Sequence, residues 1–377
     1  MKNKKVLYVR SGPYEVNPKG YNLQEVGLGK ALGNLGVDVD ILYYSKKKKQ
    51  SKVLDGNKGT VRILWTKGIK LLRTGIYPQI LNKRFLDKYD AVIVSEYSQV
   101  MSVLISRIHS NTYVYNGPYY NLFKIPCLEP VYDRLFVKHL KKNVKKFFCK
   151  SNLSQNFLKE KGLTNSIVTG VGLDTAKFDK DEKILVDTKN VLNIMSGHRN
   201  ILYVGGISER KNTGFLMEVF NNLKKDPKNK DVQLVIVGNG SKKYTNYCKK
   251  LLNKDVKNDV KWCGSLKNSQ LKYIYKMSNL FLLPSLLEIM GMVLLEAMYF
   301  GLPVVSSRTA GADMLIDNEK NGYVISEFNS NLWSEKISTI LNDDELAIKI
   351  GKNNKSKILS DCSWDKIAKV FCENINI

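Results

Sequence analysis

Two glutamates, Glu288 and Glu296, are the residues of this sequence whose spacing best suggests ligand chemistry. Glu288 follows an apolar run, 280–283, that is typical of a buried strand and is ended by Pro284. Glu296 comes eight residues later, inside a helix predicted for 292–300. Carboxylates accept hydrogen bonds from hydroxyls, so the pair could hold two parts of one polyhydroxylated ligand. In the alternative interpretation, Glu288 is a solvated loop residue and Glu296 faces water on an amphipathic helix.

A cationic loop is the second candidate for chemistry. Arg210 and Lys211 lie between a predicted strand, 200–204, and a predicted helix, 213–223. Helix amides and a lysine at such a junction can together hold a phosphate. The alternative is that both side chains are solvated charges in a lysine-rich protein.

Four glycines lie in loops that follow predicted strands, where a loop can wrap a ligand at a helix amino end or let it approach the backbone closely. Gly12 and Gly20 lie in the loop after the first strand, and Gly238 and Gly264 follow two strands of the second half. No G-x-G-x-x-G motif follows the first strand, so the dinucleotide-binding fingerprint is absent. Ordinary loop geometry is the alternative interpretation for Gly12 and Gly20.

Predicted strands and helices alternate in both halves of the chain, and the candidate residues lie in the loops and helices that follow the strands. This pattern predicts an α/β protein with two doubly wound Rossmann-like domains and parallel sheets. A length of 377 residues is also long for one core. We predict domains at 1–185 and 186–360, divided within a polar stretch, and a final helix at 361–377 that packs back on the first domain.

The composition restricts the class of binding partner but does not select one class. The net charge of +25 favours an anionic partner, which could be a membrane surface, a nucleic acid or a phosphorylated substrate. A coding bias toward Lys and Asn is the simpler alternative. The six cysteines show no C-x-x-C pair and no metal-ligand spacing, which is typical of reduced thiols in a cytosolic protein. With no signal peptide or membrane-spanning run, we expect a cytoplasmic protein.

A basic amphipathic helix is predicted between 130 and 150. Its apolar residues recur at roughly helical spacing, with five lysines between them: Val131, Leu135, Leu140, Val144, Phe147 and Phe148, and Lys138, Lys141, Lys142, Lys145 and Lys146. Such a helix can lie on an anionic membrane, which would make the protein peripheral on the inner face of the plasma membrane. Alternatively, its apolar side packs on its own domain, or 147–149 begins a strand and shortens the helix.

Several segments in this order resemble the retaining glycosyltransferases of the GT-B fold, in the large family numbered four. They are 204–212, 237–240, 283–285, the element Glu288/Gly291/Glu296, and 297–305. The resemblance covers the carboxyl half well and the amino half only loosely. It implies two Rossmann-like domains facing a central cleft, with acceptor binding in the first and donor binding in the second.

The resemblance also assigns roles to residues. It implies that Glu288 contacts the hydroxyls of the donor sugar, with help from the backbone of Met290, Gly291 and Met292. Glu296 would bind the ribose hydroxyls and Lys211 the diphosphate, so that Glu288 and Lys211 are the predicted catalytic residues. The predicted donor-binding residues are Gly12, Gly20, Arg210, Lys211, Gly238, Gly264, Glu288, Met290, Gly291, Met292 and Glu296.

The sequence departs from the family pattern in two places. Gly206 stands where an arginine normally follows the first glycine of the phosphate loop, and Arg210 is the candidate replacement. The family often has a histidine in the amino domain near the donor sugar, but no histidine of this chain falls on that position. Asn116 is our candidate for the equivalent place.

The predicted function is retaining transfer of a hexose or N-acetylhexosamine from a nucleotide sugar, with a UDP-sugar expected. The acceptor would be a cell-surface polysaccharide or a lipid-linked glycan. No Asp-x-Asp cluster has a metal-like placement, so we expect no metal, and no cofactor besides the donor. The alternatives are a transferase acting on a soluble acceptor or a protein, and a non-transferase enzyme of the same fold, such as a sugar-nucleotide epimerase. A nucleic-acid-binding protein has only charge in its favour, and we expect no nucleic-acid partner.

Overall fold

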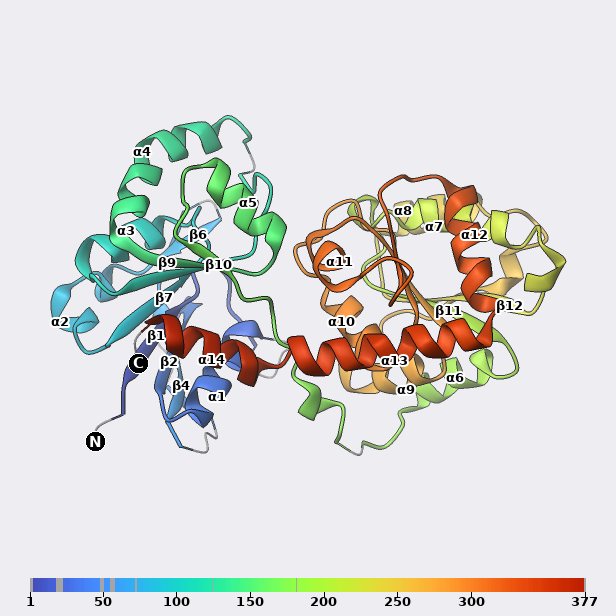
Figure 1. The fold of residues 1–377 in the computed structure, drawn as a ribbon, viewed down its shortest axis with the longest axis horizontal. Helices are drawn as coiled ribbons and strands as arrows, with labels where there is room; N and C mark the ends of the chain where they lie inside the picture. Colours follow the sequence, from blue (N-terminus) through green and yellow to red (C-terminus); the bar gives the residue numbers. More distant parts are fainter. Residues whose placement is uncertain are drawn as a thin grey trace. The chain divides into compact units, whose positions relative to one another are not determined.

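The computed structural model describes residues 3–17, 23–47, 51–54, 58–71, 73–123, 125–180 and 182–375. The chain forms two compact units (Figure 1). Unit 1 comprises Met1–Asp174 and Cys362–Ile377, and unit 2 comprises Thr175–Asp361.

Unit 1 contains an eight-stranded sheet in the order β10-β9-β8-β7-β1-β2-β4-β3. Its strands are β1 (Lys5–Val9), β2 (Asp38–Ser45), β3 (Lys52–Leu54), β4 (Val61–Lys67), β7 (Ala91–Ser95), β8 (Thr112–Asn116), β9 (Val144–Cys149) and β10 (Ser166–Val168). All neighbouring pairs are parallel except β3 with β4. A separate hairpin joins β5 (Ile69–Leu71) to β6 (Thr74–Ile76). The helices are α1 (Gln24–Asn34), α2 (Lys83–Leu86), α3 (Val100–Ile108), α4 (Leu128–Asn143), α5 (Asn152–Glu160) and α14 (Trp364–Ile375).

The last helix, α14, returns to unit 1, as the fold prediction stated. The Leu173 amide donates to the Cys362 carbonyl at 2.8 Å, and Phe371 stacks on Phe148 at a centroid distance of 3.9 Å. The Trp364 ring lies so close to Gly27 and Gly172 that a Cβ on either glycine would approach ring atoms to 2.2 and 2.4 Å. Glycine at these two positions therefore allows α14 to dock.

Unit 2 contains a six-stranded, fully parallel sheet in the order β13-β12-β11-β14-β15-β16. The strands are β11 (Arg199–Val204), β12 (Val232–Val237), β13 (Val260–Trp262), β14 (Leu280–Leu283), β15 (Val304–Ser307) and β16 (Tyr323–Ile325). The helices are α6 (Val186–Met195), α7 (Thr213–Leu223), α8 (Lys242–Lys250), α9 (Leu271–Lys276), α10 (Met292–Tyr299), α11 (Ala310–Leu315), α12 (Ser330–Leu341) and α13 (Asp344–Asp361). Every residue of β12 is buried, and because alternate side chains point to opposite faces, both faces of the sheet are covered.

Two predictions about element and domain boundaries were wrong. The boundary between the units lies at 174 and not at 185, because the intervening segment packs on unit 2. The Lys272 ammonium donates to the Phe178 carbonyl at 3.3 Å, and the Phe178 ring stacks on Tyr299. The helix predicted for 130–150 ends at Asn143, and the alternative in which 147–149 belongs to a strand holds, since Val144–Cys149 form β9 with residues 147–149 buried.

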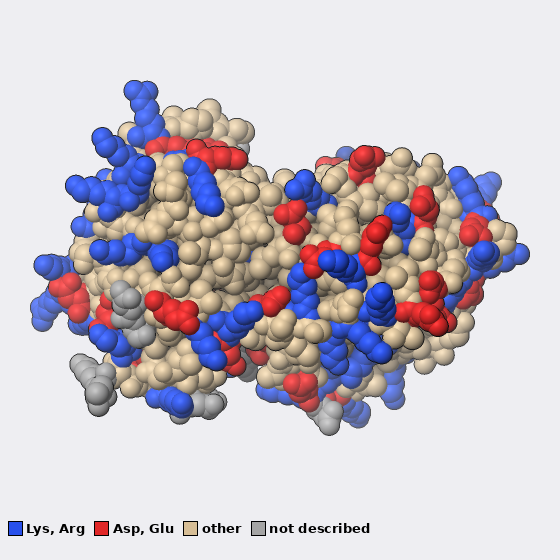
Figure 2. All heavy atoms as spheres, in the orientation of Figure 1, with Lys and Arg blue, Asp and Glu red and all other residues tan. Residues whose placement is uncertain are grey.

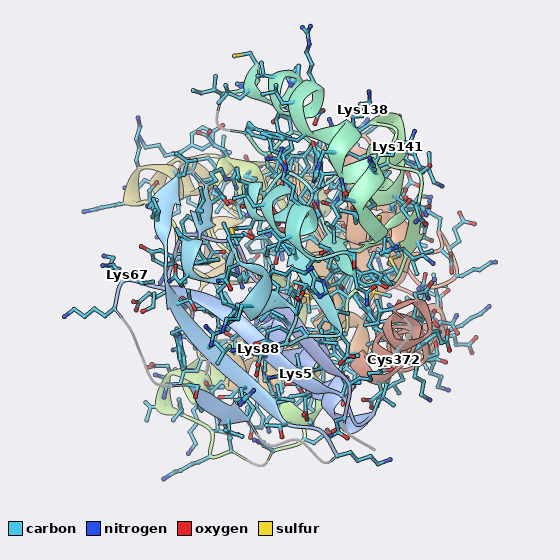
Figure 3. All side chains as sticks on the ribbon, turned by 90° about the vertical axis from the view of Figure 1, so that its left-hand side faces the viewer. Lys5, Lys67, Lys88, Lys138, Lys141 and Cys372 are labelled. Carbon is cyan, nitrogen blue, oxygen red and sulfur yellow. The ribbon has the colours of Figure 1, made fainter. Side chains whose placement is uncertain are left out.

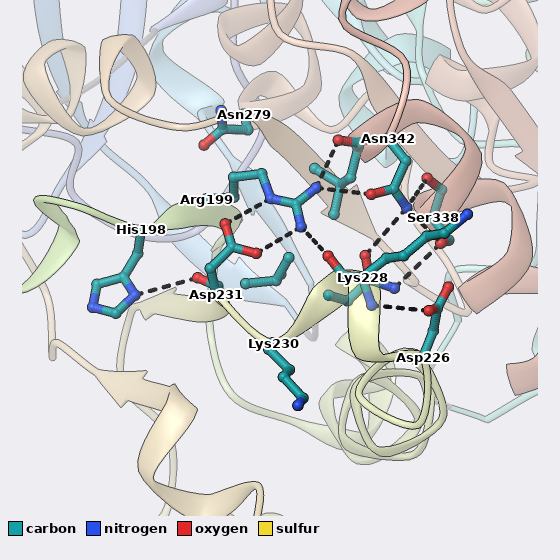
Figure 4. Close-up of polar contacts among 12 residues, drawn as sticks. His198, Arg199, Asp226, Lys228, Lys230, Asp231, Asn279, Ser338 and Asn342 are labelled. Carbon is teal, nitrogen blue, oxygen red and sulfur yellow. Dashed lines mark hydrogen bonds and ion pairs between the residues drawn. The ribbon is translucent and has the colours of Figure 1, made fainter.

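The Arg199 side chain links several elements at the amino edge of the unit 2 sheet (Figure 4). Its Nε and Nη2 atoms donate to the Asp231 carboxylate at 2.8 and 2.6 Å. Its Nη1 atom donates to the Leu341 carbonyl and to Asn342 Oδ1 at 2.8 and 3.1 Å, and Nη2 also donates to the Lys228 carbonyl. The guanidinium thus uses five donor contacts to join β11, the loop before β12, and the end of α12.

Among the described residues, no helix combines the length and the apolar character needed to cross a bilayer.

Candidate active site

The carboxyl edge of the unit 2 sheet brings the predicted cationic loop and the first glutamate together. β11 pairs directly with β14, so the loops that follow these two strands are neighbours. Lys211 Nζ forms an ion pair with Glu288 Oε2, and Arg210 Nη1 lies 3.4 Å from the same oxygen. Lys211 and Glu288 therefore lie in contact at this edge, although they are 77 residues apart in sequence.

Hydrogen bonds to main-chain carbonyls hold these two loops together as well. The Leu286 amide donates to the Arg210 carbonyl at 2.9 Å, and Arg210 Nη1 donates to the Leu287 carbonyl at 2.8 Å. Arg210 therefore positions the loop that carries Glu288, in addition to adding charge. Its own side chain remains 53% exposed, whereas those of Lys211 and Glu288 are only 12% and 18% exposed.

The conformation of the cationic loop follows from its sequence. Ser208 caps a short turn, and its hydroxyl accepts from the Lys211 amide at 3.4 Å. Asn212 then adopts a left-handed φ of 51°, which asparagine tolerates better than most residues, and α7 begins at Thr213. The Thr213 hydroxyl accepts from the Ser208 amide at 3.1 Å. Lys211 thus lies just before the amino end of α7, where the helix dipole favours an anion.

The Tyr203 hydroxyl lies beneath this loop and donates to the Gly206 carbonyl at 2.8 Å. Burial, and next the Glu288 carboxylate, raise the pKa of Tyr203 well above its usual value. The phenol therefore stays neutral and acts as a fixed hydrogen-bond donor to the loop.

The second predicted glutamate, Glu296, is fully buried on α10. The Tyr275 hydroxyl donates to Glu296 Oε2 at 2.9 Å, and burial raises the pKa of the carboxyl well above its usual value. The interpretation in which Glu296 faces water is therefore wrong. Its proposed contact with ribose stays a prediction.

Backbone geometry fixes the turn between the two glutamates. Gly291 has a left-handed φ of 64° at the start of α10, and a Cβ there would lie 3.1 Å from Leu283 and 3.3 Å from the Glu288 side chain. Met290 is buried, and Met292 is the first residue of the helix. A Cβ at Gly311, at the start of α11, would lie 2.0 Å from the Met290 carbonyl oxygen. Gly311 thus lets α11 support the turn.

The glycines predicted to approach the donor separate into three cases. Gly238 and Gly264 lie at the carboxyl edge of the unit 2 sheet, and the Gly238 amide donates to the Gly264 carbonyl at 2.8 Å. A Cβ on Gly238 would lie 1.9 Å from the Gly205 carbonyl oxygen. The close packing of the loops that contain Gly205 and Gly238 therefore requires glycine at 238, whether or not a ligand binds there. Gly12 belongs to unit 1, where it lies against the Tyr14 ring, and Gly20 lies outside the described residues.

Asn116, the candidate for the family's histidine position, is a buried structural residue of unit 1. Its Oδ1 atom accepts from the Tyr97 amide at 3.1 Å, and its Nδ2 atom donates to the Pro118 carbonyl and to the Ser154 hydroxyl. The side-chain amide is therefore fully occupied within the unit.

Sequence reasoning missed three supporting residues: Ser208, Tyr275 and Gly311. The serine could have been found, because a serine directly before a helical turn is a capping signal. Nothing in the sequence around Tyr275 or Gly311 indicates a partner, because each contacts a residue from another element. Within the described part of the chain, no group of three His, Cys, Asp or Glu residues is arranged to hold a metal ion.

Comparison with known proteins identifies the class. The model of the family described as glycosyl transferases group 1 matches residues 187–357, which lie inside unit 2. Residues 187–357 are thus similar to the group 1 glycosyltransferases, and the two Rossmann-like units give the chain the GT-B fold.

Particular relatives are distant. Spore coat protein SA of Bacillus subtilis is 26% identical over 58% of this chain and 59% of that protein. The lipopolysaccharide 1,2-N-acetylglucosaminetransferase of Salmonella typhimurium is 30% identical over 49% of this chain and 50% of that enzyme. The chain thus spans 59% and 50% of the lengths of these two curated relatives.

Solved structures with the same fold cover the whole chain. Anabaena HepE in complex with UDP has a TM-score of 0.75 at 16% identity and covers 99% of each chain. Sucrose-phosphate synthase from Thermosynechococcus elongatus has a TM-score of 0.72 at 17% identity and covers 98% of each chain.

Proposed function

We propose that the protein is a retaining, metal-independent glycosyltransferase that moves a hexose or N-acetylhexosamine from a UDP-sugar to a cell-surface polysaccharide or lipid-linked acceptor. The observation that carries the proposal is the shielded Lys211–Glu288 pair at the carboxyl edge of the parallel sheet, where open α/β sheets bind ligands. The structures of HepE in complex with UDP and with UDP-glucose support a uridine nucleotide as the carrier of the donor sugar. Retention of the anomeric configuration rests on the family resemblance.

In the proposed reaction, Lys211 and the amino end of α7 stabilise the diphosphate that leaves the sugar. Glu288 accepts hydrogen bonds from the sugar hydroxyls. Without donor, Glu288 neutralises Lys211. A donor whose phosphate contacts the lysine and whose hydroxyls contact the glutamate replaces this ion pair with two separate contacts. Glu296 would hold the ribose hydroxyls from inside α10.

We propose that the acceptor binds at the carboxyl edge of the unit 1 sheet. Arg10 and Glu25 form an ion pair there at 3.2 Å, and Glu96 follows β7 with a left-handed φ of 61°, which is uncommon for glutamate and is often found at functional sites. Lys150 follows β9, and its ammonium lies 4.7 Å from the centre of the Tyr115 ring. Burial lowers the pKa of Lys150, against the opposing effect of Glu96.

The test is hydrolysis and transfer with a panel of UDP-, GDP- and ADP-sugars. We expect a UDP-sugar to be consumed, and Lys211→Ala and Glu288→Ala each to abolish most of that activity. Lys243→Ala is the matched control, because Lys243 is an exposed lysine of the same unit. No consumption of any nucleotide sugar, or equal losses in the control, would contradict the proposal.

A further inference from the structure

The inward face of helix α4 makes its contacts with other residues of unit 1. Tyr132 and Leu140 are buried in a cluster with residues of β9. Both acidic residues of the helix also turn toward the unit, where Glu129 and Asp133 contact Lys161 Nζ at 3.3 and 2.5 Å. The buried apolar residues of the helix and both of its acidic residues therefore make their contacts inside unit 1.

The outward face of α4 and its continuation to 145 has a different composition. Its exposed residues are Pro130, Val131, Arg134, Leu135, Lys138, Lys141, Lys142 and Lys145, and no Asp or Glu is among them. We call this set the α4 outer face. Lysine and arginine side chains project from this region in Figure 2, and Figure 3 labels Lys138 and Lys141 on the helix.

Apolar and cationic residues share one stripe of this face. Val131, Leu135, Lys138 and Lys142 follow the i, i+4, i+7, i+11 spacing that aligns side chains along a helix. Val131 and Leu135 are 53% and 63% exposed, and Ile125, just before the helix, is 52% exposed. Apolar side chains therefore occupy the first half of the stripe and cations the second.

The positive field extends beyond α4. Burial lowers the pKa of His139, and the charges of Arg107 on α3 and Lys142 on α4 lower it further. Arg107 is itself exposed. Cations from two neighbouring helices therefore act on the same part of the surface.

We propose that the α4 outer face is a docking surface for a bilayer that contains anionic lipid. Lysines bind lipid phosphates from the headgroup layer, while Val131, Leu135 and Ile125 reach the boundary with the acyl chains. A nucleic acid would use the cations but would leave the exposed apolar residues without a role. The surface is argued from α4 alone, whereas its purpose, access to a lipid-linked acceptor, rests on the function proposed above.

The test is co-sedimentation of the full chain with vesicles of phosphatidylglycerol mixed with phosphatidylcholine, and with phosphatidylcholine alone. We expect binding only to the anionic vesicles, and weaker binding as salt is raised. The pair Lys138→Glu/Lys142→Glu should weaken binding more than about tenfold. The pair Val131→Ser/Leu135→Ser should weaken it severalfold and should leave a residual attachment that salt removes.

The matched control is Lys352→Glu/Lys355→Glu, which changes the net charge equally on exposed positions of α13 in unit 2. It should bind vesicles like the unaltered protein. Failure of the unaltered protein to sediment, an equal loss in this control, or equally tight binding to duplex DNA or to another protein through the same residues would overturn the proposal.

The two proposals fail separately in this design. Lys211→Ala should bind vesicles normally, and the α4 variants should still hydrolyse the nucleotide sugar in solution. Circular dichroism of each variant verifies folding, which substitutions at such exposed positions should leave intact.

Discussion

The two edges of the unit 2 sheet each contain a cation paired with an acid. They differ in how many hydrogen-bond donors of the cation are already engaged within the protein. At the amino edge, the Arg199 guanidinium makes five donor contacts, to one carboxylate, two carbonyls and one side-chain amide. At the carboxyl edge, the three-donor ammonium of Lys211 has Glu288 as its partner among the described residues. A cation whose hydrogen-bond donors are all engaged stabilises the fold, whereas a cation with unused donors can bind a ligand.

Lys211→Ala tests the difference between the two edges most directly. We expect kcat/KM for sugar transfer to fall by about 10²–10³-fold, since a donor aimed at developing negative charge contributes on that scale. The midpoint of thermal unfolding should change little, because the pair lies at a loop edge. Steady-state kinetics and calorimetry on one preparation measure both, and a large loss of stability with normal kinetics would reverse the assignment.

Arg199→Ala should give the opposite result. We expect a loss of about 2–3 kcal/mol in the free energy of unfolding, because several acceptors at the edge lose their donor together. Activity per folded molecule should persist. Arg199→Lys, which keeps the charge but lacks the planar fork, should recover only part of the stability in denaturant titration. Full recovery of the free energy of unfolding would mean that the positive charge, and not the hydrogen-bond geometry, stabilises this edge.

Glu296→Gln tests the buried carboxyl behind the site. Since folding raises the pKa of Glu296, the folded state holds a proton that the unfolded chain releases above about pH 4.3. Stability should therefore fall as pH rises from there toward the folded pKa, and the glutamine variant should show a flatter profile. If the profile is unchanged, Glu296 is not the titrating group. A rise in KM for the donor in the same variant would support the ribose contact.

Asp231→Asn should have the smallest effect. Hydrogen bonds from Arg199 lower the pKa of Asp231, so its contribution is present above the unfolded pKa of about 3.9 and is lost as pH falls through the folded value. The side chain is half exposed, so we expect about 1 kcal/mol or less at neutral pH. Urea titrations at neutral and acid pH should show a loss in the variant that shrinks in acid. An equal loss at both pH values would contradict the charge argument.

Much of the carboxyl-terminal unit could be predicted from sequence. The apolar run before Pro284, the glycine at 291 and the helix after it follow from local chemistry, and the structure has β14, a left-handed glycine and α10 there. Ser208 and the basic pair after it likewise predict a capped turn at a helix start. Amphipathic spacing was less reliable near 130–150, because the same apolar residues fit a long helix or a helix followed by a strand.

Local sequence sets the residues of the candidate site and the turns that hold them, because caps, glycines and strand ends act within a few residues. The tertiary fold brings Lys211 into contact with Glu288, since this requires β11 to lie beside β14. It also decided that Glu296 is enclosed beside Tyr275, that residues 175–185 belong to unit 2, and that α14 packs on Gly27 and Gly172. Each of these contacts joins segments far apart in the chain, and strand order and helix packing set such distances.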